Sequence, residues 1–421
     1  MDNFPNLTPF QTLVFPNDSL YPADMGPEEK PQATSWEETE LTKAEVNILL
    51  LPVFFLARKG QKGVIEYRTK IAREEGETDL IWRVYPGSLG PLGPFEKDVF
   101  RAMEYLIMRR PFPIENPIPF SIYDLRKAMG LSDSGKIYSD IKTALLKIAQ
   151  VTVHSKHAFY SKKRRAWVED VFHLYERIVF DGEQLPDGSI AETNFLWLGS
   201  WYLESLNAFY LRPFDYRFYR SLESPVAKRL YEILGVKFQR AKEKGEEFVR
   251  YHYSDLCQLL PLTRQVFLSK AQEKLAPGHK ELEAAHFLAG VEWLPLREND
   301  WIVRYWPGPR AFREIEEVRH RTEWAPSWIV DEAYERAETE AYIRGFASYL
   351  AEELEDPGSY AFYERLARLA RGNAALEDLI YRVLSEVKDD FRRGRVRKSK
   401  GAAFTDRLKR ACLERGLSLS V

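Results

Sequence analysis

Cysteine is scarce in this sequence, with only Cys257 and Cys412 in 421 residues. Two cysteines so far apart can form neither a disulfide framework nor a CxxC metal site. We therefore expect a reduced protein inside the cell.

Long hydrophobic runs are missing as well. The best apolar stretch, NILLLPVFFLA, is shorter than the roughly 20 residues of a membrane-spanning helix and contains Pro52. The first residues, MDNFPNLTPF, lack the basic start and the apolar run of a secretory signal. These absences predict a cytoplasmic protein with no membrane partner.

No catalytic constellation stands out. Gly130 to Lys136 fits the spacing of a P-loop, but Ile137 stands where that motif needs a hydroxyl for Mg²⁺. His154 and His157 lie three residues apart on a predicted strand, so their side chains point to opposite faces and make no metal pair. We expect no enzyme activity, no cofactor and no metal site.

The sequence lacks an excess of either charge, since the formal net charge is only −2. The two signs are nevertheless segregated along the chain. Residues 1–43 carry eight acids and two bases, residues 323–391 carry 16 acids and seven bases, and residues 392–421 carry ten bases and two acids. A mildly basic middle and a basic tail favour a polyanionic partner that binds at particular surfaces. Ordinary solvated charge is the alternative.

Apolar and aromatic residues, at 45% and 14%, are plentiful enough for sizeable cores in two or three domains. Residues 1–43 combine five prolines with net negative charge, which is typical of a disordered arm. Three β-type runs follow: EVNILLLPVFFLA, GVIEYRTKI and DLIWRVY. They predict a small antiparallel sheet.

Helical periodicity begins after this sheet, in FEKDVFRAMEYLIMRR. A capping box at Ser121 opens a short helix that Gly130 ends, and a third helix spans about 135–149. Two strands joined by the turn SKKRR come next. Helix, helix, helix and hairpin is the order of a winged helix-turn-helix, so we predict the first such domain over residues 44–182.

The third helix is expected to expose a polar face. At 100° per residue its apolar side chains gather on one side, which leaves small polar and cationic ones on the other, suited to a DNA major groove. The hairpin tip adds cations suited to phosphates, although a merely soluble tip is the alternative. The predicted DNA-binding residues are Lys136, Ser139, Lys142, Thr143, Lys162, Lys163, Arg164 and Arg165.

The same order of elements recurs in residues 183–322, which predicts a second winged-helix domain. Its helical stretch 263–288 contains Pro277-Gly278, so we expect two helices there, the second beginning at Pro277. Candidate DNA contacts in this stretch are Lys270, Lys274, His279 and Lys280.

Residues 323–391 predict an acidic helical region, and residues 392–421 a basic C-terminal tail. The tail is either a phosphate-binding patch or a solvated linker before a last short helix. Its candidate contacts are Arg392, Arg393, Arg395 and Arg397. The predicted fold class is α+β: two tandem winged helix-turn-helix domains, the first with an added small antiparallel sheet, and a helical C-terminal region.

Four stretches between about residues 45 and 310 carry a family resemblance: DLIWRV, MGLSDSGKIYSDIKTALLKIAQVTV, SPVAKRLYEIL and KLAPGHKELEAAHFLAGVEW. In them the chain resembles the replication initiator protein A family of bacterial plasmids. The resemblance implies a non-catalytic protein that binds repeated double-stranded sites in a plasmid origin. It also implies help in opening adjacent DNA and recruitment of host replication proteins such as the replicative helicase.

A winged-helix transcriptional repressor is the rival interpretation, but it needs only one reading domain per chain. A second domain used for homodimerisation is another open alternative. In either case the protein would be associated with plasmid or nucleoid DNA.

Overall fold

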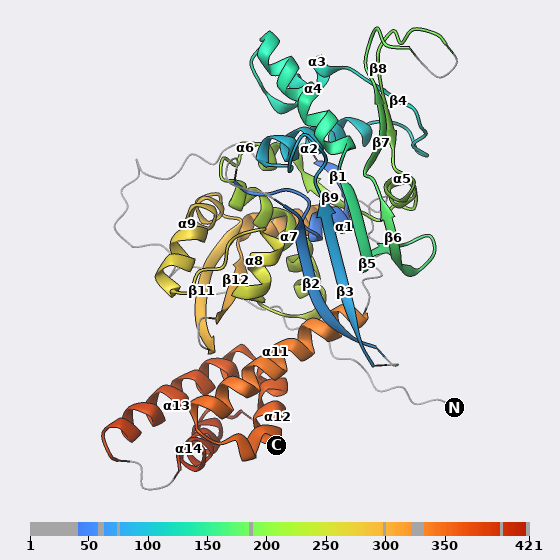
Figure 1. Cartoon of the computed structure of the whole chain (residues 1–421). Coiled ribbons are helices and arrows are strands. Elements are labelled where there is room, and N and C mark those ends of the chain that lie inside the picture. The colour runs from blue at the N-terminus through green and yellow to red at the C-terminus, as the bar shows by residue number, and fades with distance from the viewer. Residues whose placement is uncertain are drawn as a thin grey trace, which may run out of the picture. The chain divides into compact units, whose positions relative to one another are not determined.

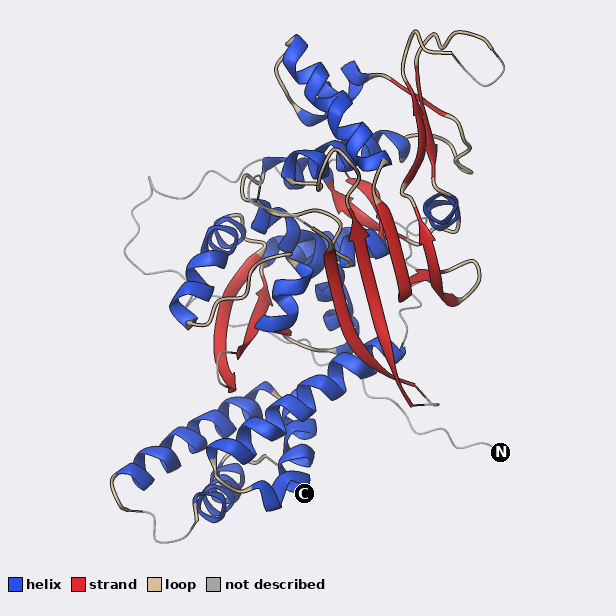
Figure 2. Cartoon of the chain, viewed as in Figure 1, coloured by secondary structure: helices blue, strands red, loops and turns tan. Residues whose placement is uncertain are grey.

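The structure is a computed structural model that describes most of the chain. The described residues are 41–57, 63–73, 76–184, 188–297, 300–320, 332–395 and 399–417. They form helices and several small antiparallel sheets, which confirms a mixed α and β fold (Figures 1 and 2). Of the predicted arm, residues 1–40 lie outside the described residues.

A four-stranded antiparallel sheet contains two of the three predicted N-terminal strands. Its order is β2-β3-β5-β6. The bounds are β2 (Ile65–Arg73), β3 (Gly76–Tyr85), β5 (Thr152–Ser161) and β6 (Ala166–Phe172). The predicted hairpin that follows the third helix therefore joins the N-terminal sheet.

The first predicted strand is wrong for most of its length. Strand β1 (Leu41–Glu45) pairs with β9 (Leu211–Asp215), and the chain then turns into helix α1 (Val46–Leu50). The Glu45 carboxylate accepts the backbone N–H of Ile48 at 2.8 Å and so caps this helix. The buried N-cap thus starts a helix within a run of residues whose side chains favour a strand.

The first of two repeated units begins after strand β3. Its three-stranded sheet has the order β4-β8-β7. The elements are α2 (Pro94–Ile107), β4 (Ile118–Phe120), α3 (Ile122–Met129), α4 (Gly135–Ala149), β7 (Tyr175–Val179) and β8 (Asn194–Leu198). Ser121 caps α3 and Gly130 ends it with φ of 68°, as predicted.

The second unit repeats this topology. Its sheet has the order β10-β12-β11, so in both units the first strand pairs with the third. The elements are α7 (Pro225–Lys244), β10 (Val249–His252), α8 (Tyr253–Leu259), α9 (Leu268–Ala284), β11 (Leu288–Arg297) and β12 (Asp300–Pro307). The helices and a final strand pair recur in the predicted order, whereas the hairpin predicted for the first unit lies in another sheet.

The hairpin β5–β6 is inserted into the first unit between α4 and β7. The predicted second strand of that hairpin is in fact two strands, β6 and β7. The strand is interrupted at His173 and Leu174, and β7 belongs to a different sheet from β6. The predicted boundary at residue 182 falls between β7 and β8, which are paired. A cut there would split the sheet of the first unit, so the predicted domain limits 44–182 and 183–322 need correction.

Helix α9 is continuous, and the expectation of two helices is wrong. Pro277 lies inside it and forgoes one backbone hydrogen bond. A Cβ on Gly278 would come within 2.5 Å of Val226 Cγ1 and 2.8 Å of the Ala227 nitrogen. Pro277-Gly278 thus marks the close approach of α9 to the start of α7.

A buried ionic cluster joins the first helices of the two units. Glu232 of α7 pairs with Lys97 of α2 at 2.8 Å, with Arg101 of α2 at 2.9 Å and with Arg229 at 3.1 Å. Burial alone would raise the pKa of Glu232, but the three cations outweigh this effect and lower the pKa to about 2. One hydrophobic cluster also runs through both units, so they share a single core.

A bundle of helices follows the second unit after α10 (Pro309–His320). Its core includes Leu350, Leu366, Ile380 and Leu408, and it also takes in Leu296 and Ile302 from the sheet of the second unit. Its helices are α11 (Glu332–Glu353), α12 (Tyr360–Arg371), α13 (Ala374–Arg392) and α14 (Lys400–Glu414). Part of the predicted basic tail is therefore a packed helix. None of the helices in the described ranges is long and apolar enough for a membrane crossing.

We expect Glu232→Gln to destabilise the protein by about 3–5 kcal/mol, because three buried cations would lose their compensating charge. Urea unfolding followed by circular dichroism measures the change. The control is Glu66→Gln, which removes the exposed ion pair with Arg83 and should cost under about 1 kcal/mol. Equal losses for the two variants would contradict the structural importance of the buried cluster.

Candidate nucleic-acid interface

Helix α4 exposes the face that the sequence predicts. Its N-cap Ser134 accepts the Ile137 N–H at 3.4 Å, which fixes the start of the helix. The side chains Ile141, Leu145 and Ile148 are buried against the rest of the unit. The predicted contacts Lys136, Ser139, Lys142 and Thr143 are all exposed. Their position is confirmed, and their binding to DNA stays a prediction.

Lys142 is held in place by an aromatic ring. Its Nζ lies 4.4 Å from the ring centroid of Phe180, which follows β7 directly. A cation over an aromatic face is stabilised without losing its charge. The connection between β7 and β8 therefore orients one cation of the exposed α4 face.

The cationic hairpin tip joins β5 and β6, as predicted, but these strands belong to the four-stranded sheet and not to the sheet of the α4 unit. Lys163 and Arg164 pair with Glu204 of α5 (Ser200–Asn207) at 3.3 and 3.7 Å. Lys162 donates to the Phe209 carbonyl at 3.2 Å, and burial lowers its pKa. Arg165 is exposed in the same turn. A shared carboxylate thus offsets part of the charge that was expected to face phosphates.

The strand pair that accompanies α4 is β7–β8, because these strands lie in the sheet of the same unit. The connection between them, residues 180–193, contains acids and no lysine or arginine. The loop of this hairpin therefore brings no cations. Arg177, on β7 itself, is exposed and lies over the Trp197 ring at 5.0 Å. Phosphate contacts would have to come from this arginine and from the helices.

Helix α9 presents three of its four candidate residues at the surface. Lys270, Lys274 and Lys280 are exposed, and Lys270 pairs with Glu273 at 2.6 Å. His279 is 7% exposed, and one ring nitrogen lies 3.1 Å from the Tyr305 hydroxyl. Burial lowers its pKa to about 4, so it is neutral at pH 7. The prediction that His279 contacts DNA is wrong, because its side chain packs inward.

Two apolar side chains beside α9 were missed. Val266 and Phe267, the last residues before the helix, are 57% and 71% exposed. Adjacent exposed apolar residues at the start of a helix are typical of a contact surface. The sequence signal was available, since VF follows the turn PLTRQ, but it looks like an ordinary core pair.

Two of the four candidate residues of the tail form ion pairs within the bundle. Arg392 lies 3.5 Å from Asp389, and Arg395 lies 3.5 Å from Asp390. Arg393 is exposed at the end of α13. Arg397 lies outside the described residues.

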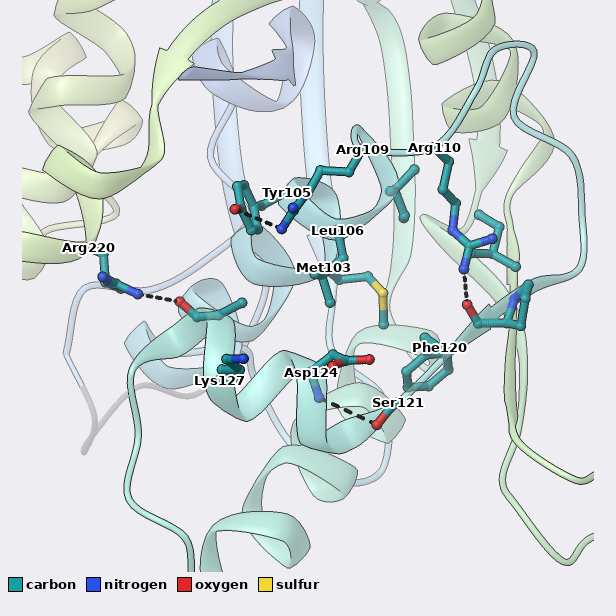
Figure 3. Close-up of a pocket in the computed structure, with 14 residues that line it drawn as sticks. Met103, Tyr105, Leu106, Arg109, Arg110, Phe120, Ser121, Asp124, Lys127 and Arg220 are labelled. Atoms are coloured by element: carbon teal, nitrogen blue, oxygen red, sulfur yellow. Dashed lines mark hydrogen bonds between the residues drawn. The ribbon is translucent and has the colours of Figure 1, made fainter. Parts of the chain in front are cut away.

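Four further cations surround a hollow between α2, β4 and α3 (Figure 3). They are Arg109, Arg110, Lys127 and Arg220. Sequence reasoning missed this set because Arg220 comes from α6 (Tyr216–Ser221), far along the chain. Within the described residues, no cluster of histidine, cysteine or acidic side chains could hold a metal ion.

Repeated helix-rich units with exposed cations are typical of the class of proteins that bind nucleic acid. Residues 43–258, just over half of the chain, match the family described as Replication initiator protein A. The protein belongs to this family, as the sequence resemblance predicts.

Comparison with curated proteins found no match. Two solved structures of domains 2 and 3 of RctB are similar to the chain, with 16% and 14% sequence identity and TM-scores of 0.39 and 0.38. The first similarity covers 62% of this chain and 98% of the solved one. The second covers 63% and 97%.

We expect the buried, neutral His279 to make the protein less stable at acid pH. Below pH 6.5 the unfolded chain binds a proton at this residue, whereas the folded chain does not until about pH 4. Stability falls as pH drops through this window, by at most about 3 kcal/mol. His279→Gln should lose this part of the pH dependence in urea titrations, and the exposed His286→Asn should keep it.

Proposed function

We propose that this initiator is a sequence-specific double-stranded DNA-binding protein whose two repeated units are winged helix-turn-helix domains. The observation that carries the proposal is the repeated topology, because α4 and α9 occupy equivalent positions in the two units. Each follows a shorter helix, as a recognition helix does. The exposed cationic and small polar side chains of α4 suit base edges in a major groove.

The limits of the reading units follow from strand pairing. We infer a first unit over residues 94–198, with β5–β6 as an insertion, and a second over residues 225–307. The helical bundle, residues 332–417, is a third part whose core also includes Leu296 and Ile302 of the second unit. We assign no catalysis to any of them, since the chemistry of an initiator is binding.

The shared core gives the two reading helices one relative orientation. The ionic cluster around Glu232 and the continuous hydrophobic cluster link α2 to α7 without a free linker. Two recognition helices held in this way engage half-sites at one fixed spacing on the same duplex. Linkage also raises the effective concentration of the second contact, so two weak heads bind tightly together.

The expected target is a set of repeated sites in a plasmid origin, in the cytoplasm. Family membership supports the initiator role. Opening of adjacent DNA, recruitment of the replicative helicase and homodimer formation belong to the proposal as consequences of that role. A transcriptional repressor is the alternative that shares the same DNA-reading surfaces.

Sequencing of genomic and plasmid fragments that the purified full chain retains tests this proposal. Tandem repeats beside AT-rich DNA would support the initiator, whereas an isolated palindrome would support the repressor. Retention without any enriched sequence would refute specific reading. Insertion of five base pairs between two half-sites should sharply reduce affinity if the reading helices are rigidly linked.

We expect Lys136→Ala and Lys142→Ala to weaken binding to the selected site more than binding to random duplex. A good base contact carries about 1–3 kcal/mol of discrimination. Competition with random DNA in a fluorescence anisotropy titration measures the difference. Lys409→Ala, an exposed lysine on α14, is the control and should change neither affinity.

The hairpin tip provides a contrast to these two variants. Lys163→Ala combined with Arg164→Ala should lower affinity equally on both duplexes, and only weakly, because Glu204 already offsets their charge. If Lys142→Ala behaves in the same uniform way, that lysine contacts phosphate and not a base.

We further expect Phe267 to contact thymine methyl groups through the start of α9. Apolar side chains read the thymine methyl in the major groove. Deoxyuridine in place of one contacted thymine should weaken wild-type binding about fourfold, and Phe267→Ala should remove that difference. Leu413→Ala, which truncates an apolar side chain that is 80% exposed on α14, should leave it intact. A Phe267→Ala protein that still prefers thymine would place these methyl contacts elsewhere.

A further inference from the structure

A hollow of about 490 Å³ lies between the end of α2, strand β4 and helix α3 (Figure 3). Arg220, at the end of α6, closes one side of it. Its volume falls within the range of pockets that hold small molecules. None of its lining residues lies on the proposed recognition helices α4 and α9.

The lining divides into an apolar floor and a cationic rim. Met103, Ile107, Ile118 and Phe120 of the floor are all buried. The rim carries four cations and a single carboxylate, Asp124. A ligand that fits both parts has an apolar body and more than one negative charge.

The rim guanidinium groups are held by neutral oxygens. Arg109 donates to the Tyr105 hydroxyl at 3.2 Å, Arg220 to the Ala128 carbonyl at 2.9 Å, and Arg110 to the Pro119 carbonyl. These contacts orient the groups without neutralising them. Figure 3 shows the three contacts around the opening.

None of the four rim cations forms an ion pair with a described residue, and Asp124 does not pair with any of them. The hairpin tip differs, since Glu204 offsets Lys163 and Arg164 there. Each arginine has five N–H donors, and the contacts above use one apiece. The remaining donors suit phosphate oxygens, which arginine binds in a fork.

We propose that this pocket binds the phosphate of a nucleotide, with the sugar or base against the apolar floor. The phosphate belongs either to a DNA strand or to a free nucleotide, and the recognising chemistry is the same. The DNA source rests on the proposed function, because α3 precedes α4 and the first helix of a helix-turn-helix crosses the DNA backbone. The free source does not depend on it.

The test uses the full chain and the variants Lys127→Gln and Lys127→Arg. Lys127 is exposed, so neither change should disturb folding. Calorimetric titration with ADP probes the free source. Anisotropy titration of a labelled duplex at several salt concentrations probes the DNA source. Lys409→Gln on α14 is the matched control.

Loss of one charge-assisted contact should weaken binding about tenfold. For the free source, ADP binds the wild type, Lys127→Gln weakens it and Lys127→Arg restores it. For the DNA source, ADP does not bind, and Lys127→Gln lowers duplex affinity and the salt slope by about 0.9, one phosphate contact.

Two outcomes would overturn the pocket assignment. One is a Lys127→Gln protein that matches the wild type in both titrations. The other is a Lys409→Gln protein that loses as much as Lys127→Gln, because the effect would then be general charge. A wild-type chain that binds ADP through Lys127 but no duplex would sink the proposed function and leave the pocket assignment standing. Arg109→Gln repeats the test from the other side of the opening.

Discussion

The arrangement of the two units depends on one buried carboxylate. Glu232 is fully buried, and three cations from α2 and α7 surround it. A buried charge without partners costs several kcal/mol, so α2 and α7 cannot separate without exposing or abandoning these groups. The same contact positions the first helix of each unit, on which α3, α4, α8 and α9 are built. The two units consequently form one body with a shared core.

Local signals made part of this fold predictable. The bounds of α4 agree with the predicted 135–149 because Ser134 caps the helix and its apolar side chains repeat every three or four residues. Ser121 and Gly130 delimit α3 for the same reason. Caps and periodicity act within a few residues, so the sequence alone reports them.

The features that the sequence could not reveal depend on partners far along the chain. No glycine or proline marks the point at which the strand after the SKKRR turn leaves one sheet for another, since the change is decided by the pairing of β7 with β8. His279 is buried because Tyr305, on β12, packs against it. Pro277 lies inside a helix, and the neighbouring Gly278 lets α9 approach α7. The pocket cations come from the turn after α2, from α3 and from α6, which only the tertiary structure brings together.

If both units bind one duplex, as in the proposed function, the close contact between α9 and α7 bears on whether the protein or the DNA deforms. The Glu281 carboxylate of α9 accepts hydrogen bonds from the backbone N–H groups of Glu223 and Ser224, directly before α7. A force on α9 is therefore transmitted to α7 and to the ionic cluster. Opening that cluster costs about 3–5 kcal/mol, whereas smoothly bending a duplex of 20–30 base pairs costs of order 1–6 kcal/mol. DNA with flexible pyrimidine–purine steps has a bending free energy at the low end of that range. Such DNA deforms more easily than the ionic cluster opens. An origin rich in such steps would bend to fit the protein, and the elastic energy stored in the bend would already be available for strand separation.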